Sequence, residues 1–341
     1  MRSLFLSALS AAAITLSATT AMAQDVTLRV HHFMGDRAVL HSQMLTDWAN
    51  ELSEKSDGRI ALELFPAMSL GGAPGDLYDQ AVDGAVDIIL TLPGYTAGRF
   101  NQSEVFELPF MMEDPVATSQ ALWAMIDTDL QEAEFDELQI LTAWVHGPGV
   151  IHSKTPIRSL EDMAGVELRG PTRLITDLIG ELGATPVGMP LPAIPENLSK
   201  GAISAATLPW EITPAIRLSE LVSNATEMGG DRALYTAVFI LGMNIDAYDA
   251  LPDDLRAILD STTGAVLSAT ATQIVIDADA VGRKIAQDNG TKIVTLDTAE
   301  VARWIEASQP VYDRYIERSA GKGFDGSATI ARAQALIAEN M

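Results

Sequence analysis

The chain has 341 residues, of which 48% are hydrophobic and none is cysteine, and its formal net charge is −24 at pH 7. This length allows a substantial buried core and about two domains. The lack of cysteine excludes a disulfide framework, a thiolate metal site, a catalytic thiol and a lipid anchor on cysteine. The strong negative charge disfavours nucleic acid and anionic lipid surfaces as partners, and it is ordinary for a well-solvated exported protein.

The first 23 residues have the pattern of a secretory signal peptide. Arg2 precedes an apolar run over residues 4–16, and the small-residue sequence Ala21-Met22-Ala23 follows as a cleavage site. The run is too short and too rich in alanine to span a membrane, and no later stretch approaches the ~18 uninterrupted apolar residues that a span requires. We therefore expect a periplasmic protein that begins near Gln24 and inserts no segment into the membrane. Loss of Arg2, the one charged residue of this segment, changes the net charge from −24 to −25.

The mature chain opens with a βαβαβ pattern. Alternating apolar residues predict strands at 26–30 and 60–64, and an apolar run predicts another at 86–90. Helices are expected between them, one capped by Asp36 and one near residues 75–84. The apolar face of the first helix consists of Leu40, Met44, Trp48 and Leu52. This order predicts an α/β fold in which helices cover a mostly parallel sheet.

Two long extended segments, residues 140–152 and 234–243, suggest that two domains are joined by crossing strands and not by a flexible linker. Each domain is then expected to contain a sheet flanked by helices. The expected division is residues 24–144 plus 233–273 for the first domain and residues 145–232 plus 274–341 for the second.

Residues 252–289 are predicted to form one helix, roughly 55 Å long at 1.5 Å per residue. Its apolar stripe rotates around the axis after Gln273, as expected for a helix that packs on one domain and then on the other. The stripe consists of Leu255, Leu259, Val266 and Ala269, followed by Ile274, Ala278, Val281 and Ile285. The alternative is two helices with a break near Gly264 or Gln273.

The main candidate for a ligand-binding residue is Arg169. In the expected strand 166–169, Glu167 and Arg169 share one face, and Arg169 lies at the carboxyl end, where α/β sheets bind ligands. A guanidinium at that place offers a planar fork that binds a carboxylate through two hydrogen bonds. The alternative is a surface arginine that pairs with Glu167 or Asp162.

Other candidates follow other predicted strands. Trp210 comes just after a strand and is suited to form one wall of a cleft. Tyr95 follows the third strand, and His32 and Phe33 follow the first, so all three are expected to face the cleft from the first domain. Asn244 ends the second crossing segment and offers a neutral hydrogen bond. Ordinary packing is the alternative for each. The full set of candidate ligand-binding residues is Arg169, Trp210, Tyr95, Phe33, His32, Asn244 and Glu167.

Several enzyme-like strings lack the context that their chemistry needs. Residues 321–326 fit GxGxxG, but they follow a predicted helix, whereas a dinucleotide binds at a strand-to-helix turn. Ser319 and Lys322 fit SxxK without its companion motifs. His31 and His32 are adjacent, which is too strained for both rings to hold one metal. We therefore expect no catalytic residue, no metal and no cofactor, and hence not an enzyme.

A series of motifs runs through nearly the whole mature chain. Between residues 165 and 211 they read LRGPT, LGATPVGMP, SKGAI and LPWE, and further segments lie at 65–88, 98–111 and 243–255. Together they resemble the solute-binding proteins of tripartite ATP-independent periplasmic (TRAP) transporters. The resemblance implies a two-domain periplasmic-binding-protein fold with a long spanning helix and an organic acid bound between the domains. It also implies delivery of that acid to a small and a large membrane permease subunit, driven by an ion gradient.

The resemblance gives roles to two candidates and also shows two departures. It implies that Arg169, in LRGPT, clamps the substrate carboxylate and that Trp210 lies against the ligand. However, residues 146–149 read HGPG where many relatives carry a second arginine, and residues 204–209 read SAATLP where DGQENP is frequent. The usual polar partner beside the carboxylate is therefore missing. This favours a less polar or aromatic acid, framed by Trp210, Tyr95 and Leu191.

Two other functions remain open at this point. One is a ligand-sensing subunit of a membrane signalling receptor, which would use the same cleft with a different partner. The other is a periplasmic hydrolase, which would need a nucleophile–base pair in a chain that has only five histidines.

Overall fold

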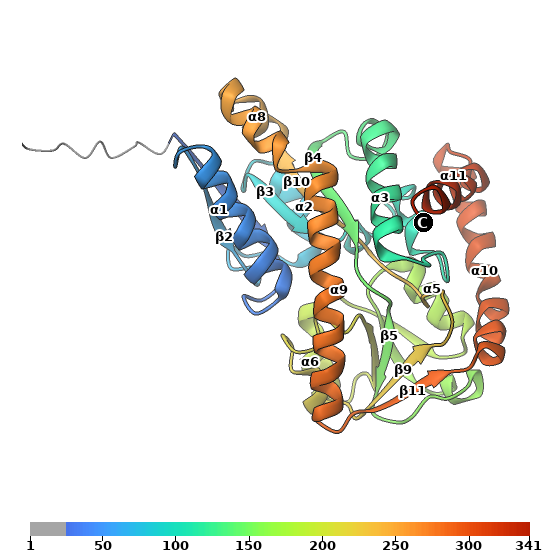
Figure 1. Ribbon diagram of the computed structural model, residues 1–341. Coiled ribbons are helices and arrows are strands. Elements are labelled where there is room, and N and C mark those ends of the chain that lie inside the picture. The colour runs from blue at the N-terminus through green and yellow to red at the C-terminus, as the bar shows by residue number, and fades with distance from the viewer. Residues whose placement is uncertain (1–24) are drawn as a thin grey trace, which may run out of the picture.

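A computed structural model describes residues 25–341, which form two β-sheets flanked by helices (Figure 1). The predicted signal peptide lies outside the described residues. The first sheet has the order β2 (Ile60–Phe65), β1 (Val26–His32), β3 (Ile88–Thr91), β10 (Val238–Asn244) and β4 (Leu138–Val145). The second has the order β11 (Lys292–Leu296), β9 (Asn224–Met228), β5 (Val150–Ser153), β8 (Ala205–Leu208), β6 (Glu167–Gly170) and β7 (Thr185–Gly188).

The helices lie on the faces and flanks of these sheets. No helix within residues 25–341 is long and apolar enough to cross a membrane. The α-helices are α1 (Thr46–Lys55), α2 (Leu77–Val82), α3 (Pro115–Met125), α4 (Gln131–Ala133), α5 (Arg173–Glu181), α6 (Ile194–Lys200), α7 (Ile245–Asp249), α8 (Asp253–Ser261), α9 (Gly264–Asp288), α10 (Thr298–Lys322) and α11 (Gly326–Glu339).

The opening of the chain forms the predicted βαβαβ unit, in which β1 pairs in parallel with both β2 and β3. The four apolar residues predicted for one face of the first helix are all buried. That helix begins as a π-helical segment, Leu40–Leu45, and continues as α1. The prediction that Asp36 caps it is wrong, because the chain enters the helix at Val39 without a side-chain cap.

The two extended segments do cross between the sheets. β4 belongs to the first sheet, and the chain continues through residues 146–149 into β5 of the second sheet. The segment leading into β10 runs beside this crossing, and the Gly149 N–H donates to the Tyr235 carbonyl at 2.9 Å. The expected division into domains remains a prediction. Its second domain ends in α11, which packs against α3 beside the first sheet (Figure 1).

The long helix predicted over residues 252–289 is two helices, so the single-helix prediction is wrong. α8 ends at Ser261 and α9 begins at Gly264, which adopts a left-handed φ of +63°. The Trp48 indole donates to Thr262 at 3.0 Å, which ties the break to α1. α9 has 25 residues, or roughly 37 Å. It packs against α3 and β4 and then reaches the second sheet, so it still spans both domains (Figure 1).

The buried face of α9 also differs from the predicted stripe. Val266 is 65% exposed, and Val281 and Ile285 are exposed as well. The buried side is made largely of small side chains, and at Gly282 the helix lies so close to the Trp210 carbonyl oxygen that a Cβ would overlap it. Its buried residues are Leu267, Ser268, Ala271, Thr272, Val275, Gly282 and Ala286. The periodicity of apolar residues therefore predicted the wrong face of α9 as the buried one.

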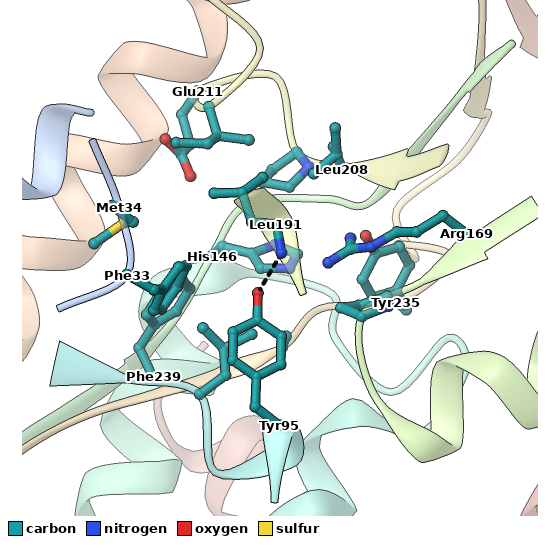
Figure 2. A pocket seen from close by; sticks show the side chains of 15 residues that line it. Phe33, Met34, Tyr95, His146, Arg169, Leu191, Leu208, Glu211, Tyr235 and Phe239 are labelled. Carbon is teal, nitrogen blue, oxygen red and sulfur yellow. Dashed lines mark hydrogen bonds between the residues drawn. The ribbon is translucent and has the colours of Figure 1, made fainter. Parts of the chain in front are cut away.

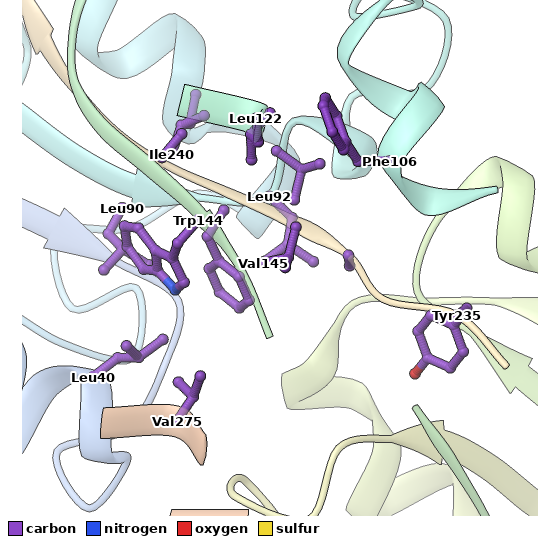
Figure 3. Packing of buried hydrophobic residues seen from close by; sticks show 14 of the residues in the cluster. Leu40, Leu90, Leu92, Phe106, Leu122, Trp144, Val145, Tyr235, Ile240 and Val275 are labelled. Atoms are coloured by element: carbon purple, nitrogen blue, oxygen red, sulfur yellow. The ribbon is translucent and has the colours of Figure 1, made fainter. Parts of the chain in front are cut away.

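The core of the first domain supports the region where the two domains meet. Trp144 of β4 stacks on Phe239 of β10, with ring centroids 5.4 Å apart and planes within 5°. Val275 of α9 and Leu90 of β3 lie around the same cluster (Figure 3). β4, β10 and α9 therefore form a rigid base, and Phe239 is the last ring of that base before the space between the domains.

Gly282→Ala tests the close packing of α9. A Cβ at this position would overlap the backbone carbonyl oxygen of Trp210. We expect this substitution to lower the free energy of unfolding by about 1–3 kcal/mol, although alanine is intrinsically the better helix former. The measurement is equilibrium denaturation in urea. Gly321→Ala is the matched control, because nothing lies within 4 Å of its Cβ position. Equal stability of the two variants would contradict close packing at Gly282.

Candidate functional site

A cavity lies between the two sheets, where the crossing segments pass. Its empty volume is about 390 Å³, including space open to solvent. Most of its lining is apolar or aromatic, with a few polar groups (Figure 2). The lining residues are Phe33, Met34, Leu92, Tyr95, His146, Arg169, Pro171, Leu191, Leu208, Pro209, Glu211, Ile212, Tyr235, Ala237 and Phe239.

Arg169 enters the cavity from β6, and its guanidinium points toward the centre (Figure 2). The side chain is only 2% exposed. Nε donates to the Met189 carbonyl and Nη1 to the Thr207 carbonyl, both at 2.9 Å. A guanidinium carries five N–H donors, so these two bonds fix its position and leave other N–H groups for a ligand.

The charge of Arg169 has no anionic partner within the protein. Among residues 25–341, no carboxylate forms an ion pair with it, so its alternative as a paired surface arginine is excluded. Burial lowers the pKa of its guanidinium from the ordinary value, yet arginine stays protonated in proteins. A buried and unpaired cation is costly, and an anion that enters the cavity would remove that cost. The site is therefore suited to a carboxylate.

Two tyrosines and a histidine lie near the guanidinium. The Leu191 N–H donates to the Tyr95 hydroxyl at 3.1 Å, which joins the two sides of the cavity (Figure 2). Burial raises the pKa of both Tyr95 and Tyr235, so both phenols stay neutral. Burial lowers the pKa of His146 to about 4. Its Nδ1 carries the proton, since it contacts the Gly147 carbonyl at 2.5 Å, and Nε2 is left as an acceptor.

The walls of the cavity are aromatic and aliphatic. Phe33 meets Tyr95 edge to face at 5.1 Å and lies nearly parallel to Phe239 at 6.4 Å. Leu191 and Leu208 supply apolar surface from the second domain. Aromatic rings favour such edge-to-face and offset arrangements, so a flat apolar ligand would find matching partners here.

A second polar group, Glu211, lies across the cavity from Arg169 (Figure 2). It is 5% exposed, and its Oε2 is buried without a hydrogen-bond partner. Burial, together with the charge of Asp279, raises its pKa to about 8. Asp279 of α9 accepts the Glu211 N–H at 2.7 Å, and burial raises its own pKa to about 7. Glu211 therefore holds its proton at neutral pH.

Contacts beside the cavity hold the two domains together. The Thr172 hydroxyl donates to Glu107 Oε2 at 2.6 Å, and the Val238 N–H donates to Oε1 of the same carboxylate at 3.1 Å. Burial raises the pKa of Glu107 to about 7. Nearby, Arg173 pairs with Glu104. These polar contacts therefore join residues of both predicted domains.

The structure brings three of the candidate residues to the cavity: Arg169, Tyr95 and Phe33. Trp210 does not line this cavity but a second pocket beside it, and its contact with a ligand stays a prediction. Its indole N–H donates to Glu227 at 2.8 Å, and its ring meets His152 edge to face at 4.7 Å. A buried indole needs an acceptor, and here the acceptor belongs to β9 of the second sheet.

Three further candidates also lie away from the cavity. The His32 ring contacts the His41 ring nitrogen at 2.9 Å, within the first domain. The Asn244 side chain accepts the Ala247 N–H at 2.8 Å and so caps α7. Glu167 is exposed and accepts from the Ser204 hydroxyl at 3.1 Å. Each of these side chains satisfies a local structural need.

Among the polar and aromatic residues of the cavity, sequence patterns missed four: His146, Glu211, Tyr235 and Phe239. Glu211 directly follows Trp210, and the turn that directs the indole outward directs the carboxyl inward. His146 lies in the HGPG segment that was noted only for its lack of arginine. Tyr235 precedes β10, and Phe239 alternates within it. The sequence offers one signal for His146, Tyr235 and Phe239: they lie in or beside the two crossing segments, which must border any space between the domains.

Solved structures of similar overall shape exist for much of the chain. One is a TRAP solute-binding protein from Rhodoferax ferrireducens T118 in complex with copurified benzoate; it is 45% identical, with a TM-score of 0.90, over 92% of this chain and 98% of that one. Another, from an unidentified marine metagenome microbe, is specific for aromatic acid ligands and holds 3-hydroxybenzoate; it is 38% identical, with a TM-score of 0.90, over 93% and 99%. A third, from Bordetella bronchiseptica with bound mandelate, is 26% identical, with a TM-score of 0.84, over 92% and 99%.

The family model for bacterial extracellular solute-binding proteins, family 7 (DctP), matches residues 30–319. This match covers most of the chain, including both sheets and the cavity between them. Together with the two-domain fold, it confirms the family that the sequence motifs resemble. The chain belongs to family 7 of the bacterial extracellular solute-binding proteins, the solute-binding proteins of TRAP transporters.

Proposed function

We propose that the cavity binds an aromatic carboxylate and that Arg169 clamps its carboxyl group. The observation that carries this proposal is the buried guanidinium, which has two carbonyl partners and no anion. The aromatic walls formed by Phe33, Tyr95 and Phe239 support an aromatic ring as the remainder of the ligand. The benzoate and 3-hydroxybenzoate held by two similar proteins support the same ligand class.

Binding proceeds through closure of the two domains. The acid enters the open protein and meets Arg169 on the second domain. Contacts from Phe33 and Tyr95 then favour the closed form, in which the Leu191 N–H reaches the Tyr95 hydroxyl. A ligand shifts this equilibrium only by its differential affinity for the closed form. Exclusion of water strengthens the arginine–carboxylate pair, because the local dielectric constant falls.

The partners of the closed protein are the membrane subunits of a TRAP transporter, a small and a large permease subunit. Family membership supports this assignment and a periplasmic location. Cleavage near Ala23 stays part of the proposal. The family and the similar structures consist of binding proteins, so the proposed role is capture and delivery of the acid without turnover.

A thermal-stability screen of organic acids tests the ligand class. A ligand that binds only the native state raises the melting temperature. We expect benzoate and its hydroxylated relatives to give larger shifts than aliphatic acids of similar size. Larger shifts with sugars or amines than with any aromatic acid would contradict the proposal.

Arg169→Ala tests the clamp. We expect the dissociation constant for the best acid of the screen to rise at least ~30-fold in isothermal titration calorimetry, because one partner of a buried charge pair is lost. The melting temperature of the unliganded variant should change little, since the loss of two hydrogen bonds to carbonyls is offset by removal of a buried cation without an anionic partner. Arg217→Ala, which removes an exposed arginine, is the control. Affinity equal to that of the wild type would exclude Arg169 as the clamp.

Tyr95→Phe tests the contact that joins the two sides of the cavity. The variant keeps the ring against Phe33 and removes the acceptor for the Leu191 N–H. A single hydrogen bond contributes about 0.5–1.5 kcal/mol, so calorimetry should show affinity weakened about two- to tenfold. Tyr248→Phe removes an exposed hydroxyl that donates to Asp260 and should leave affinity unchanged. The same affinity for both variants would remove Tyr95 from the closure mechanism.

A further inference from the structure

One polar group in the cavity has no role in binding the carboxylate. Glu211 lies opposite Arg169, with its Oε2 buried and without a hydrogen-bond partner (Figure 2). Buried polar atoms are usually paired, so an unpaired one inside a ligand cavity needs an explanation. A second charged end of the ligand is one possible partner, and a neutral hydroxyl is another.

The surroundings of Glu211 distinguish these two partners. The charged and titratable groups around it are Asp279 of α9 and, across the cavity, His146, Arg169, Tyr95 and Tyr235. Asp279 contacts the Glu211 backbone N–H and lies against Gly147, where a Cβ would overlap its carboxylate. Burial disfavours the charged form of both carboxyl groups, and the charge of Asp279 raises the pKa of Glu211 further. The Glu211 side chain is therefore a neutral acid, which can donate and accept one hydrogen bond.

We propose that Glu211 is a specificity-determining residue, which selects aromatic acids that carry a hydroxyl group on the side of the ring away from the carboxylate. This inference rests on the proposed function, since Arg169 must orient the ligand first. The neutral carboxyl then pairs with the hydroxyl as both donor and acceptor. A bare benzoate leaves the Glu211 carboxyl unpaired in the closed cavity, and sites built to bond a hydroxyl discriminate against analogues that lack it.

The test compares dissociation constants for benzoate with those for 2-, 3- and 4-hydroxybenzoate and 3-hydroxyphenylacetate, by calorimetry. We expect the wild type to bind at least one hydroxylated acid about tenfold or more tighter than benzoate. In Glu211→Leu this ratio should fall to about one, and Glu211→Gln, which keeps a donor and an acceptor, should retain part of it. Glu220→Gln removes an exposed carboxylate and should leave the ratio unchanged.

The outcomes separate the inference from the proposed function. If aromatic acids bind and the ratio is the same in the wild type and in Glu211→Leu, the inference is wrong and the proposed function stands. If the wild type binds benzoate as tightly as every hydroxylated acid, the inference is also wrong. If no aromatic acid binds at all, both fail. Circular dichroism and melting curves establish that each variant is folded.

The proton on Glu211 gives an independent readout. Burial raises the pKa of this carboxyl from its ordinary value of 4.5 to about 8, so between these values the folded protein binds a proton that the unfolded chain releases. Folding stability must therefore fall as pH rises through this window. Glu211→Gln carries no such proton. The ratio of the wild-type to the variant folding constant should fall toward tenfold per pH unit between about pH 5.5 and 7.5. A ratio independent of pH would show an ionised Glu211 and overturn the donor role.

Discussion

The site depends on one constraint, which is that the Arg169 cation is buried where the protein supplies no anion. Its position follows from the second sheet. β6 pairs in parallel with β7 and β8, with Arg169 opposite Val187 and Ala206. The carbonyls of Met189, two residues after Val187, and of Thr207, one residue after Ala206, then fall within reach of the guanidinium. Neutral carbonyls orient the cation without cancelling its charge. No internal carboxylate compensates the free-energy cost of burying this cation. A carboxylate ligand can therefore provide that compensation when it binds.

This local charge explains how a protein with a net charge of −24 binds an anion. Exposed charges are screened beyond ~8 Å at physiological salt, whereas a cation in an enclosed cavity acts at full strength over a few ångströms. The acids nearest the cavity do not oppose it. Burial raises the pKa of Glu211 to about 8 and that of Glu107 to about 7, which shifts both carboxyl groups toward their neutral forms. The positive charge that lines the cavity is that of Arg169.

Sequence patterns predicted the architecture better than the cavity. Alternation identified β1 and β2 correctly, because a buried sheet face requires apolar residues at every second position. The position of Arg169 could be predicted for the same reason, since alternation and a strand end place it at the cavity. The buried face of α9 could not be predicted, because it consists largely of small residues, which carry little hydropathy signal. The direction of the Trp210 side chain could not be predicted for a related reason. Its aromatic character indicates burial, but its direction depends on Glu227, an acceptor 17 residues away in sequence. No sequence pattern indicated Glu211, since only the three-dimensional structure shows that its Oε2 is buried without a hydrogen-bond partner.

The loop after β8 shows why these failures occur together. Leu208, Glu211 and Ile212 face the cavity, while Trp210 between them faces the second sheet and α9. The Trp210 carbonyl lies against Gly282, and the Glu211 N–H donates to Asp279, so two successive residues are fixed to α9 through their backbone. Arg283 of α9 also binds Glu227, the acceptor of the Trp210 indole, with two hydrogen bonds of 2.7 and 3.0 Å. A wall held in this way is already ordered before a ligand arrives, so binding does not carry the entropic cost of ordering it. α9, which spans both domains, thus also positions one wall of the site. It does so through contacts of backbone groups and small residues, which do not appear in the periodicity of apolar residues.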